Sequence, residues 1–170
     1  MGKKGKSICL FSSKGGTGKS SIATLLSGFF AMQEKKVLII DFDLSFGSIG
    51  LLLNKESSKN IYDLYSDYSN NKFTDISDYV TKYNDNIFFL ASSSDPRQGV
   101  KINDAFIKFI LEKSIYSYDY IIIDTNSDCS NVNIDLLDNV DNVLFIMNND
   151  LLNIKNMRSM INIFKVAGKT

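Results

Sequence analysis

The 170-residue sequence contains no histidine and no tryptophan, and Pro96 is its single proline. Without histidine there is no imidazole to exchange protons near neutral pH, and most zinc sites lose their usual nitrogen ligand. Any catalysis must therefore depend on carboxylates, lysines, backbone dipoles or a bound metal.

Cysteine is almost as scarce, because only Cys9 and Cys129 are present and they lie far apart in the sequence. The sequence also has neither a secretory leader nor a run of 18 apolar residues. We therefore expect a reduced, cytoplasmic setting, and we leave contact with the inner face of a membrane open.

No charge of either sign is in excess. Lysine plus arginine and aspartate plus glutamate both number 19, which gives no overall electrostatic case for binding nucleic acid or an anionic membrane. The one dense basic cluster, Lys3, Lys4 and Lys6, is interpreted as a solvated leader before the first strand. With 44% hydrophobic residues, the length predicts one globular domain over residues 1–170.

Five short apolar runs predict β-strands, and stretches that can form helices separate them. The later runs do not alternate between apolar and polar residues, which is typical of strands covered on both faces of a parallel sheet. The sequence therefore predicts an α/β fold, a three-layer α/β/α sandwich with a mostly parallel central sheet. The runs are residues 7–11, 37–40, 87–90, 120–123 and 143–146.

Helical spacing of apolar residues follows the first strand, recurs over 102–116 and ends the sequence at 151–166. In the last segment the spacing places Leu151, Ile154 and Met157 on one face, together with Met160, Ile161 and Phe164. We expect this helix to cover the core, with a membrane-lying amphipathic helix as the alternative. Residues 61–68 and 76–83 are predicted as small surface helices.

A glycine-rich loop, Lys14-Gly15-Gly16-Thr17-Gly18-Lys19-Ser20, lies between the first predicted strand and the first predicted helix. Glycines at such a junction let successive N–H groups point at an anion beside the positive end of the helix dipole. Lys19 is then expected to reach the β and γ phosphates of a nucleotide, and the Ser20 hydroxyl to ligate magnesium. The phosphate-binding set comprises Gly15, Gly16, Thr17, Gly18, Lys19, Ser20 and Ser21. The alternative is a flexible glycine turn.

The standard phosphate loop requires glycine at position 13, but this sequence has Ser13 followed by an additional lysine, Lys14. In this respect it resembles the deviant Walker A loop of the MinD/ParA family of ATPases. The resemblance implies that ATP or ADP is bound with Mg²⁺, and that Lys14 acts in trans on the partner's ATP in an ATP-dependent homodimer. A lysine that merely decorates the loop is the alternative.

Two strand ends carry further family signatures. Asp41-Phe42-Asp43, with Gly47 nearby, resembles the family's first switch segment, and the run 120–124 ending in Asp124 resembles a Walker B motif. The resemblance implies that Asp43 orients the attacking water and that Asp41 helps to hold the water shell of the metal. It implies that Asp124 supports magnesium, usually through water. Ordinary turn and strand-end aspartates are the alternatives.

The sequence departs from the family at Asn126, because the family normally has a proline shortly after the Walker B aspartate. We expect this departure to slow hydrolysis or to change how the nucleotide state reaches partners. Family members generally run well beyond 170 residues, so we also expect the ATPase domain to be incomplete at its C-terminus. The preference for ATP over GTP rests on the resemblance alone.

The resemblance implies a slow ATPase switch that positions or regulates a partner protein of a localised assembly, of the pilus, division or partition type. Asp95-Pro96-Arg97, Tyr118-Asp119-Tyr120 and residues 149–158 most resemble the CpaE/TadZ branch, although MinD-like regulators share much of this pattern. One alternative is a nucleotide-binding scaffold with little hydrolysis. Another is a bacterial tyrosine kinase, which the absence of a C-terminal tyrosine cluster disfavours.

Overall fold

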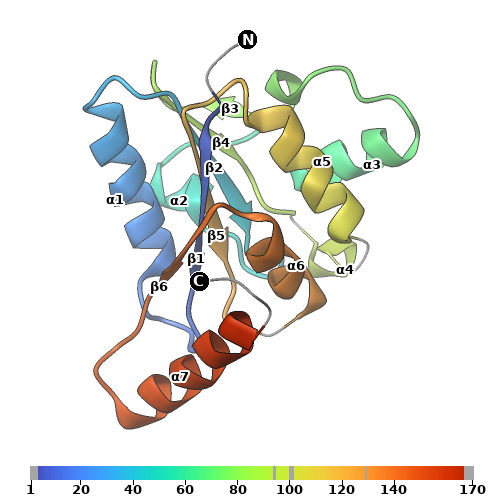
Figure 1. Cartoon of the computed structure of the whole chain (residues 1–170). Helices are drawn as coiled ribbons and strands as arrows, with labels where there is room; N and C mark the ends of the chain where they lie inside the picture. The colour runs from blue at the N-terminus through green and yellow to red at the C-terminus, as the bar shows by residue number, and fades with distance from the viewer. Residues whose placement is uncertain (1–3, 94, 100–101, 129, 167–170) are drawn as a thin grey trace.

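A computed structural model describes residues 4–93, 95–99, 102–128 and 130–166, without the side chains of 96, 99 and 163–166. Its described part is built on a six-stranded sheet with the strand order β3-β4-β2-β5-β1-β6 (Figure 1). All neighbouring strands are parallel except β3 and β4, which are antiparallel. The strands are β1 (Lys6–Phe11), β2 (Val37–Phe42), β3 (Thr81–Lys82), β4 (Ile87–Leu90), β5 (Tyr120–Thr125) and β6 (Asn142–Phe145).

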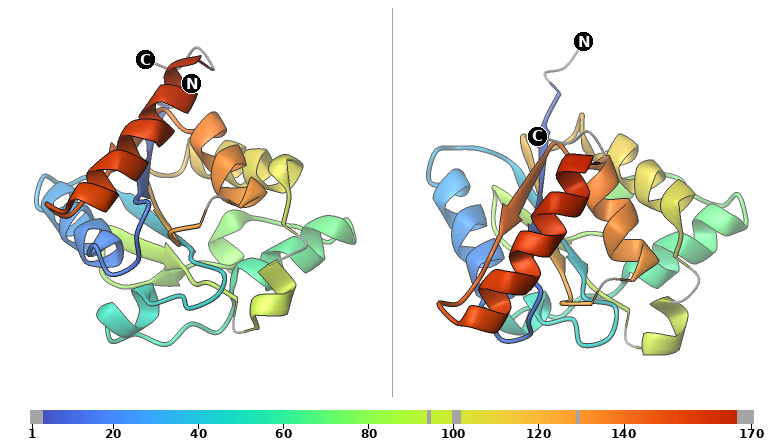
Figure 2. Two further views of the ribbon diagram at one scale, coloured as in Figure 1. Left: turned by 90° about the horizontal axis from the view of Figure 1, so that it is seen from below. Right: turned by 60° about the horizontal axis from the view of Figure 1, so that its bottom comes forward.

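Helices cover both faces of this sheet (Figures 1 and 2). Alternate strand residues point to opposite faces, so Leu10, Ile39 and Ile122 pack on the side of α1, whereas Cys9, Ile40 and Ile121 pack on the side of α5. The predicted α/β fold with a mostly parallel sheet is confirmed. The helices are α1 (Lys19–Ala31), α2 (Ile49–Leu52), α3 (Ile61–Ser69), α4 (Pro96–Gly99), α5 (Asp104–Ser114), α6 (Asn131–Asn139) and α7 (Leu151–Val166).

The prediction of a helix over 76–83 is wrong. The segment forms one 3-10 turn, Ile76–Asp78, and then the strand β3, which pairs with β4. The Asp75 carboxylate accepts a hydrogen bond from the Ser77 backbone N–H and begins the turn. Pairing with β4 then satisfies the backbone of Thr81 and Lys82 better than a short isolated helix does.

The predicted buried face of the last helix is also partly wrong. Leu151 is 87% exposed and Ile154 is 41% exposed, whereas Asn153 and Met157 are each only 1% exposed. The side chain of Phe164 lies outside the described part. Asn153 accepts a hydrogen bond from Ser13 of the glycine-rich loop. The buried side of the first turn of α7 therefore carries Asn153, and the apolar Leu151 and Ile154 are exposed.

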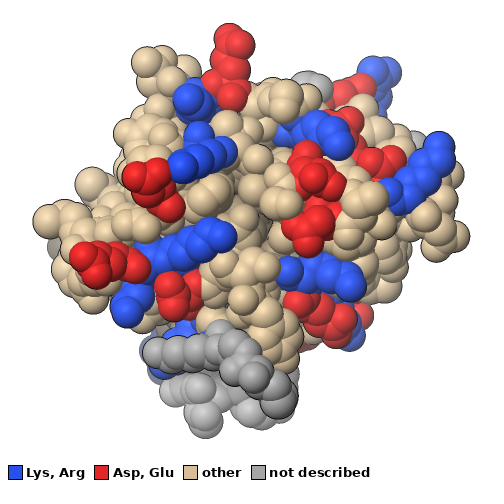
Figure 3. Space-filling model, turned by 90° about the horizontal axis from the view of Figure 1, so that it is seen from above, with Lys and Arg blue, Asp and Glu red and all other residues tan. Residues whose placement is uncertain are grey.

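The carboxyl ends of β1, β2 and β5 meet at one edge of the sheet because these strands are adjacent and parallel. In open α/β sheets this edge is where ligands bind. On the opposite side, seen from above in Figure 3, lysine and arginine side chains are interspersed with aspartate and glutamate side chains. Among the described residues, the charges of that face are therefore mixed and do not form a patch of one sign.

Candidate nucleotide-binding site

The loop between β1 and α1 turns at two glycines. Gly16, with φ of 72°, and Gly18, with φ of 88°, adopt the left-handed conformation that side chains disfavour. Gly18 is also the N-cap residue of α1, and no side chain caps this end of the helix. The first N–H groups of α1 are therefore available to an anion, at the positive end of the helix dipole.

Lys19 lies at the base of this loop and is 8% exposed. Its Nζ donates hydrogen bonds to the hydroxyl oxygens of Ser12 at 2.9 Å and Ser127 at 2.6 Å. Burial lowers the pKa of Lys19, and the carboxylates of Asp124 and Asp43 act in the opposite direction. The ammonium group is thus aimed into the site and held by neutral hydroxyls, which a phosphate oxygen could replace as a stronger acceptor.

Asp124, at the carboxyl end of β5, is fully buried, and neither of its carboxylate oxygens has a hydrogen-bond partner. Burial raises its pKa to about 6; the Ser20 hydroxyl and the Lys19 ammonium act in the opposite direction, and Asp43 adds to the rise. Ser20 lies close enough to favour the charged carboxylate without making a hydrogen bond of normal geometry. A buried carboxylate without a partner is costly, so this position is suited to a cation.

Asp41 is the register partner of Asp124 on the neighbouring strand β2, and it is 1% exposed. Its two oxygens accept hydrogen bonds from backbone N–H groups, Oδ1 from Asp43 at 3.2 Å and Oδ2 from Ile49 at 3.0 Å. Burial raises the pKa of Asp41 to about 7, with a smaller contribution of the same sign from Asp124. In this structure Asp41 shapes the loop after β2, and its role towards a metal stays a prediction.

The loop after β2 is held in place from both sides. Asp43 Oδ1 accepts hydrogen bonds from the backbone N–H groups of Ser45 and Phe46, which closes a tight turn. The Ser92 hydroxyl donates to the backbone oxygen of Asp43 at 2.6 Å. At Gly47 an added Cβ would lie 2.2 Å from Ser92 Cβ and 2.8 Å from Asp41 Oδ2, so only glycine fits here.

These segments enclose a cavity of about 570 Å³ at the carboxyl edge of the sheet. It contains the whole predicted phosphate-binding set, Gly15 to Ser21, and the predicted catalytic residue Asp43. Lys14, Asp41 and Asp124 do not line it. The remaining lining residues are Ser45, Phe46, Ser48, Leu52 and residues 125–128.

Lys14 does not line this cavity, and its ammonium group is paired outside it. Its Nζ lies 3.2 Å from Oδ2 of Asp150, just before α7, and the two side chains are 54% and 36% exposed. The action of Lys14 on a partner's nucleotide stays a prediction.

The segment after β5, where the family has a proline, is held by amide side chains. Asn133 of α6 is 1% exposed, and its Nδ2 donates to Oδ1 of Asn126 and, at 2.9 Å, to Oδ1 of Asp128. Asn126 Nδ2 also donates to Asp128 Oδ2 at 2.9 Å. This network orders one wall of the cavity without a proline. The neighbouring Cys129 lies outside the described residues.

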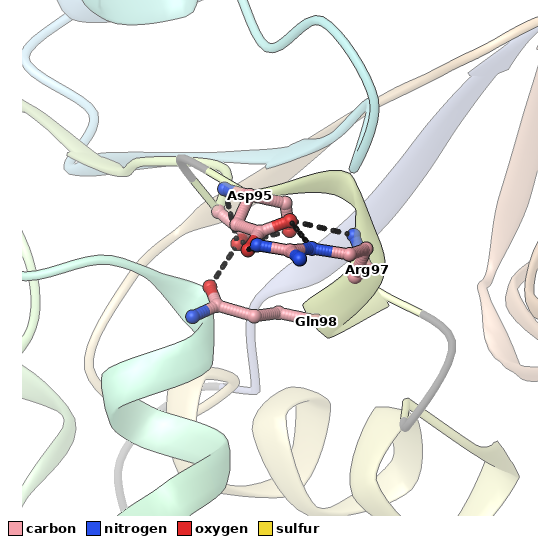
Figure 4. A network of polar contacts seen from close by, with 4 residues as sticks. Asp95, Arg97 and Gln98 are labelled. Atoms are coloured by element: carbon pink, nitrogen blue, oxygen red, sulfur yellow. Dashed lines mark hydrogen bonds and ion pairs between the residues drawn. The ribbon is translucent and has the colours of Figure 1, made fainter.

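Asp95 directly precedes the short helix α4, Pro96–Gly99, which begins beyond β4 (Figure 4). Arg97 donates from Nε and from its terminal guanidinium nitrogen to the carboxylate of Asp95, at 2.9 Å and 2.6 Å. Gln98 accepts a short hydrogen bond from the Ser93 hydroxyl. Because the Arg97 side chain is 89% exposed, this ion pair contributes little to stability.

Known proteins share this fold. The structure matches the septum site-determining protein MinD from Pyrococcus horikoshii, solved with Mg-ADP, with a TM-score of 0.83 and 20% identity, over 97% of this chain and 67% of that one. It also matches a putative plasmid partition protein from Borrelia burgdorferi, solved with AMPPNP, with a TM-score of 0.80 and 24% identity, over 98% and 71% of the two chains. An uncharacterized ATP-binding protein of Methanocaldococcus jannaschii is 30% identical over 119 residues.

A family model, the AAA domain named AAA_31, matches residues 5–170. The chain belongs to the AAA_31 family of MinD/ParA-type P-loop ATPases. The match with the Methanocaldococcus relative spans 69% of this AAA_31 chain but only 43% of the length of that relative. No helix in the described part is long and apolar enough to cross a membrane.

Sequence reasoning missed two residues of the AAA_31 site, Ser12 and Ser127. Ser12 Oγ accepts hydrogen bonds from Lys19 and Thr17 and donates to the backbone oxygen of Lys14 at 2.7 Å, so it connects the two ends of the loop. The sequence did carry a signal for Ser12, because this residue directly follows the apolar strand at the start of the loop. Ser127 offered none, because its contact with Lys19 joins residues 108 positions apart.

Proposed function

We propose that this chain binds ATP with magnesium, hydrolyses it slowly, and forms in its ATP-bound state a homodimer that positions a protein partner at a cellular site. The observation that carries the proposal is Asp124, a fully buried carboxylate with both oxygens unpartnered, next to the phosphate loop. Such a group is stable only beside a positive charge. Within this proposal, residues 1–170 belong to one ATPase domain.

The residues around Asp124 fit Mg²⁺. The Ser20 hydroxyl would bind the ion directly, and Asp124, with Asp41 behind it, would accept hydrogen bonds from its water ligands. Among the described residues, no three or more histidine, cysteine, aspartate or glutamate side chains are arranged so that together they could hold a metal ion, so phosphate and water would supply the other ligands. Mg²⁺ commonly binds in this way, and when bound it neutralises charge on the phosphates.

The phosphates themselves are accommodated at the N-terminus of α1. Gly15, Gly16 and Gly18 leave room for close approach, and Lys19 lies beside them with its ammonium group directed inwards. The cavity volume of about 570 Å³ is within the range of roughly 300–1,000 Å³ for small-molecule sites. Mg-ADP and AMPPNP in the two matched structures support a nucleotide as the ligand.

Asp43 is the residue we assign to orienting the attacking water. It lines the cavity, and one of its oxygens, Oδ1, already holds the turn at Ser45 and Phe46. Oδ2 makes no hydrogen bond in this turn and is suited to accept one from a water molecule opposite the phosphates.

A second copy of the chain is the partner that the cavity surroundings favour. Phe46 at the cavity wall and Leu51 of α2 are each 84% exposed, and the partly exposed Lys14 belongs to the phosphate loop that lines the same cavity. Exposed apolar side chains around a charged site are typical of a surface that becomes covered. In the dimer Lys14 would neutralise charge on the partner's transferring phosphate, as an arginine finger does.

Purified protein tests this proposal directly. We expect Mg-ATP to convert the chain to a dimer in light-scattering chromatography and to release phosphate slowly, and we expect Lys14→Ala to lose both effects. A Lys14→Ala protein that dimerises and hydrolyses like the wild type would contradict the role in trans. Phosphate transferred to tyrosine instead of water would identify the kinase alternative.

A nucleotide-binding scaffold with little hydrolysis is the second candidate. It is favoured by the Asn126, Asp128 and Asn133 network, which fixes the segment where a mobile second switch is expected. ATP-dependent dimerisation without phosphate release would establish the scaffold. An increase in phosphate release in Asn133→Ala would show that this network restrains turnover.

Within the family we propose the CpaE/TadZ branch, associated with pilus assembly and polar localisation. The proposal is supported by Asp95-Pro96-Arg97, by Tyr118-Asp119-Tyr120 and by residues 149–158. A fluorescent fusion in the native cell should form polar foci that depend on the pilus apparatus. Diffuse fluorescence, or foci that persist without that apparatus, would contradict this branch.

A further inference from the structure

The start of α7 and the residue just before it contact the phosphate loop through two side-chain pairs that the proposed function does not use. Lys14 Nζ lies 3.2 Å from Asp150 Oδ2, and the Ser13 hydroxyl donates to Asn153 Oδ1 at 3.0 Å. Ser13 stands where a standard phosphate loop has glycine, so the residues that make this loop unusual are those that contact α7.

Asp150 uses its two carboxylate oxygens for different contacts. Oδ1 accepts a hydrogen bond from the Asn153 backbone N–H at 2.8 Å and thereby caps α7, whereas Oδ2 receives the Lys14 ammonium. The hydrogen bond from the Asn153 N–H and the contact with Lys14 both lower the pKa of Asp150, so the carboxyl is charged at neutral pH. The cap and the ion pair can therefore be separated by substitution.

The contact with Asp150 competes with any other use of Lys14. The Lys14 side chain does not line the nucleotide cavity of its own chain, and to reach a phosphate elsewhere its ammonium must leave Oδ2 of Asp150. Because the pair is about half exposed, water screens the attraction and the contact is weak enough to break.

We propose that Asp150 is a positioning residue that holds Lys14 within its own subunit until a second nucleotide-bound subunit offers a phosphate. This inference rests on the action of Lys14 in trans under the proposed function and adds its regulation. Asp150 competes with the partner's phosphate for one ammonium group, so it raises the ATP concentration needed for dimerisation. Meanwhile the Ser13 and Asn153 contact keeps α7 attached to the loop.

The first test measures Lys14 in the nucleotide-free protein. Asp150→Asn retains a capping oxygen for the Asn153 N–H but removes the charge that faces Lys14. We expect acetylation of Lys14 by acetic anhydride, followed by peptide mass spectrometry, to become about two- to fivefold faster, as for loss of one exposed ion pair. Asp104→Asn is the matched control, because it removes the similarly exposed pair with Lys108. An unchanged Lys14 rate in Asp150→Asn would overturn the inference.

The second test measures ATP-dependent dimerisation. We expect Asp150→Asn to lower the ATP concentration for half-maximal dimerisation about two- to fivefold, and Asp150→Glu to restore it towards the wild-type value. The matched control Asp104→Asn, which removes the pair with Lys108, should leave that concentration unchanged. No change in Asp150→Asn, or an equal decrease in Asp104→Asn, would overturn the inference.

The two tests separate this inference from the proposed function. If the wild type does not dimerise with ATP while Asp150→Asn still speeds acetylation of Lys14, the fault lies in the proposed function. If the wild type dimerises but Asp150→Asn changes neither measurement, the role of Asp150 is wrong and the proposed function stands.

Discussion

Asp41 on β2 and Asp124 on β5 are direct register partners, and their buried carboxyl groups are satisfied in opposite ways. Asp41 accepts two backbone hydrogen bonds from the loop that follows it, whereas both oxygens of Asp124 are unpartnered. The Asp41 carboxyl thus holds the loop after β2 in place, whereas the Asp124 carboxyl keeps both oxygens available for a ligand. Four predictions follow from this pair and from the loops around it.

Replacing Asp124 with asparagine should have opposite effects on stability and on activity. The substitution removes a buried charge without a partner, so we expect the unfolding free energy of the nucleotide-free protein at pH 7.5 to rise by about 1–3 kcal/mol. We expect Mg-dependent hydrolysis to fall roughly 100-fold, because the site loses a group that holds the metal. Urea denaturation and phosphate release measure the two effects. A destabilised variant with normal turnover would refute the assignment of Asp124.

The stability of the nucleotide-free protein should depend on pH through the same two carboxyls. Their pKa values in the folded protein, about 7 for Asp41 and about 6 for Asp124, exceed the unfolded value, so the folded state binds more protons between pH 4 and 7. The unfolding free energy should therefore decrease by several kcal/mol, up to roughly 7, as the pH rises through this window, and it should level off above about pH 8.

Urea denaturation at half-unit pH steps measures this dependence. The control is the double variant Asp41→Asn and Asp124→Asn, in which the slope between pH 4 and 7 should largely disappear. The same slope in this variant, or a wild type that becomes more stable with rising pH, would show that these carboxyls are not responsible.

Two glycines of the same segment should respond differently to alanine. Gly18 has a φ of 88°, so Gly18→Ala should cost about 1–2 kcal/mol of unfolding free energy and weaken nucleotide binding by distorting the start of α1. Gly28 lies inside α1, and an added Cβ meets nothing within 4 Å. Gly28→Ala should therefore stabilise the protein by about 0.5–1 kcal/mol. Thermal unfolding with and without Mg-ATP compares the two; similar effects would mean that the turn at Gly18 is not required.

Gly47→Ala should separate nucleotide binding from turnover. Its Cβ would clash with Ser92 and press on Asp41, so the loop that carries Asp43 must move. We expect a loss of about 1–3 kcal/mol in unfolding free energy and a fall in the hydrolysis rate of roughly tenfold or more, with ATP affinity nearly unchanged. The second substitution Ser92→Gly removes the clashing Cβ and should restore part of both losses. No restoration would indicate that the clash with Ser92 is not the cause.

Local pattern was sufficient for the five parallel strands and for the phosphate loop. Apolar runs without alternation indicate strands buried on both faces, and a glycine-rich stretch between such a run and a helical pattern defines a strand, turn and helix by covalent proximity alone. Gly15 to Ser21 therefore come together in any fold that keeps this unit. Position at strand ends also brought Asp41, Asp43 and Asp124 to one edge, because parallel neighbours end on the same side.

The remaining features depend on contacts between residues distant in the sequence, and no local pattern encodes them. The pairing of Thr81 and Lys82 with β4 replaced an expected helix, and the anchor between Ser13 and Asn153 rotated α7 against its apolar spacing. The same holds for Ser127 beside Lys19 and for Asp150 beside Lys14. The sequence by itself determined which groups could bind a nucleotide; only the tertiary structure decided what each holds, because burial and hydrogen bonding depend on neighbours brought close by folding.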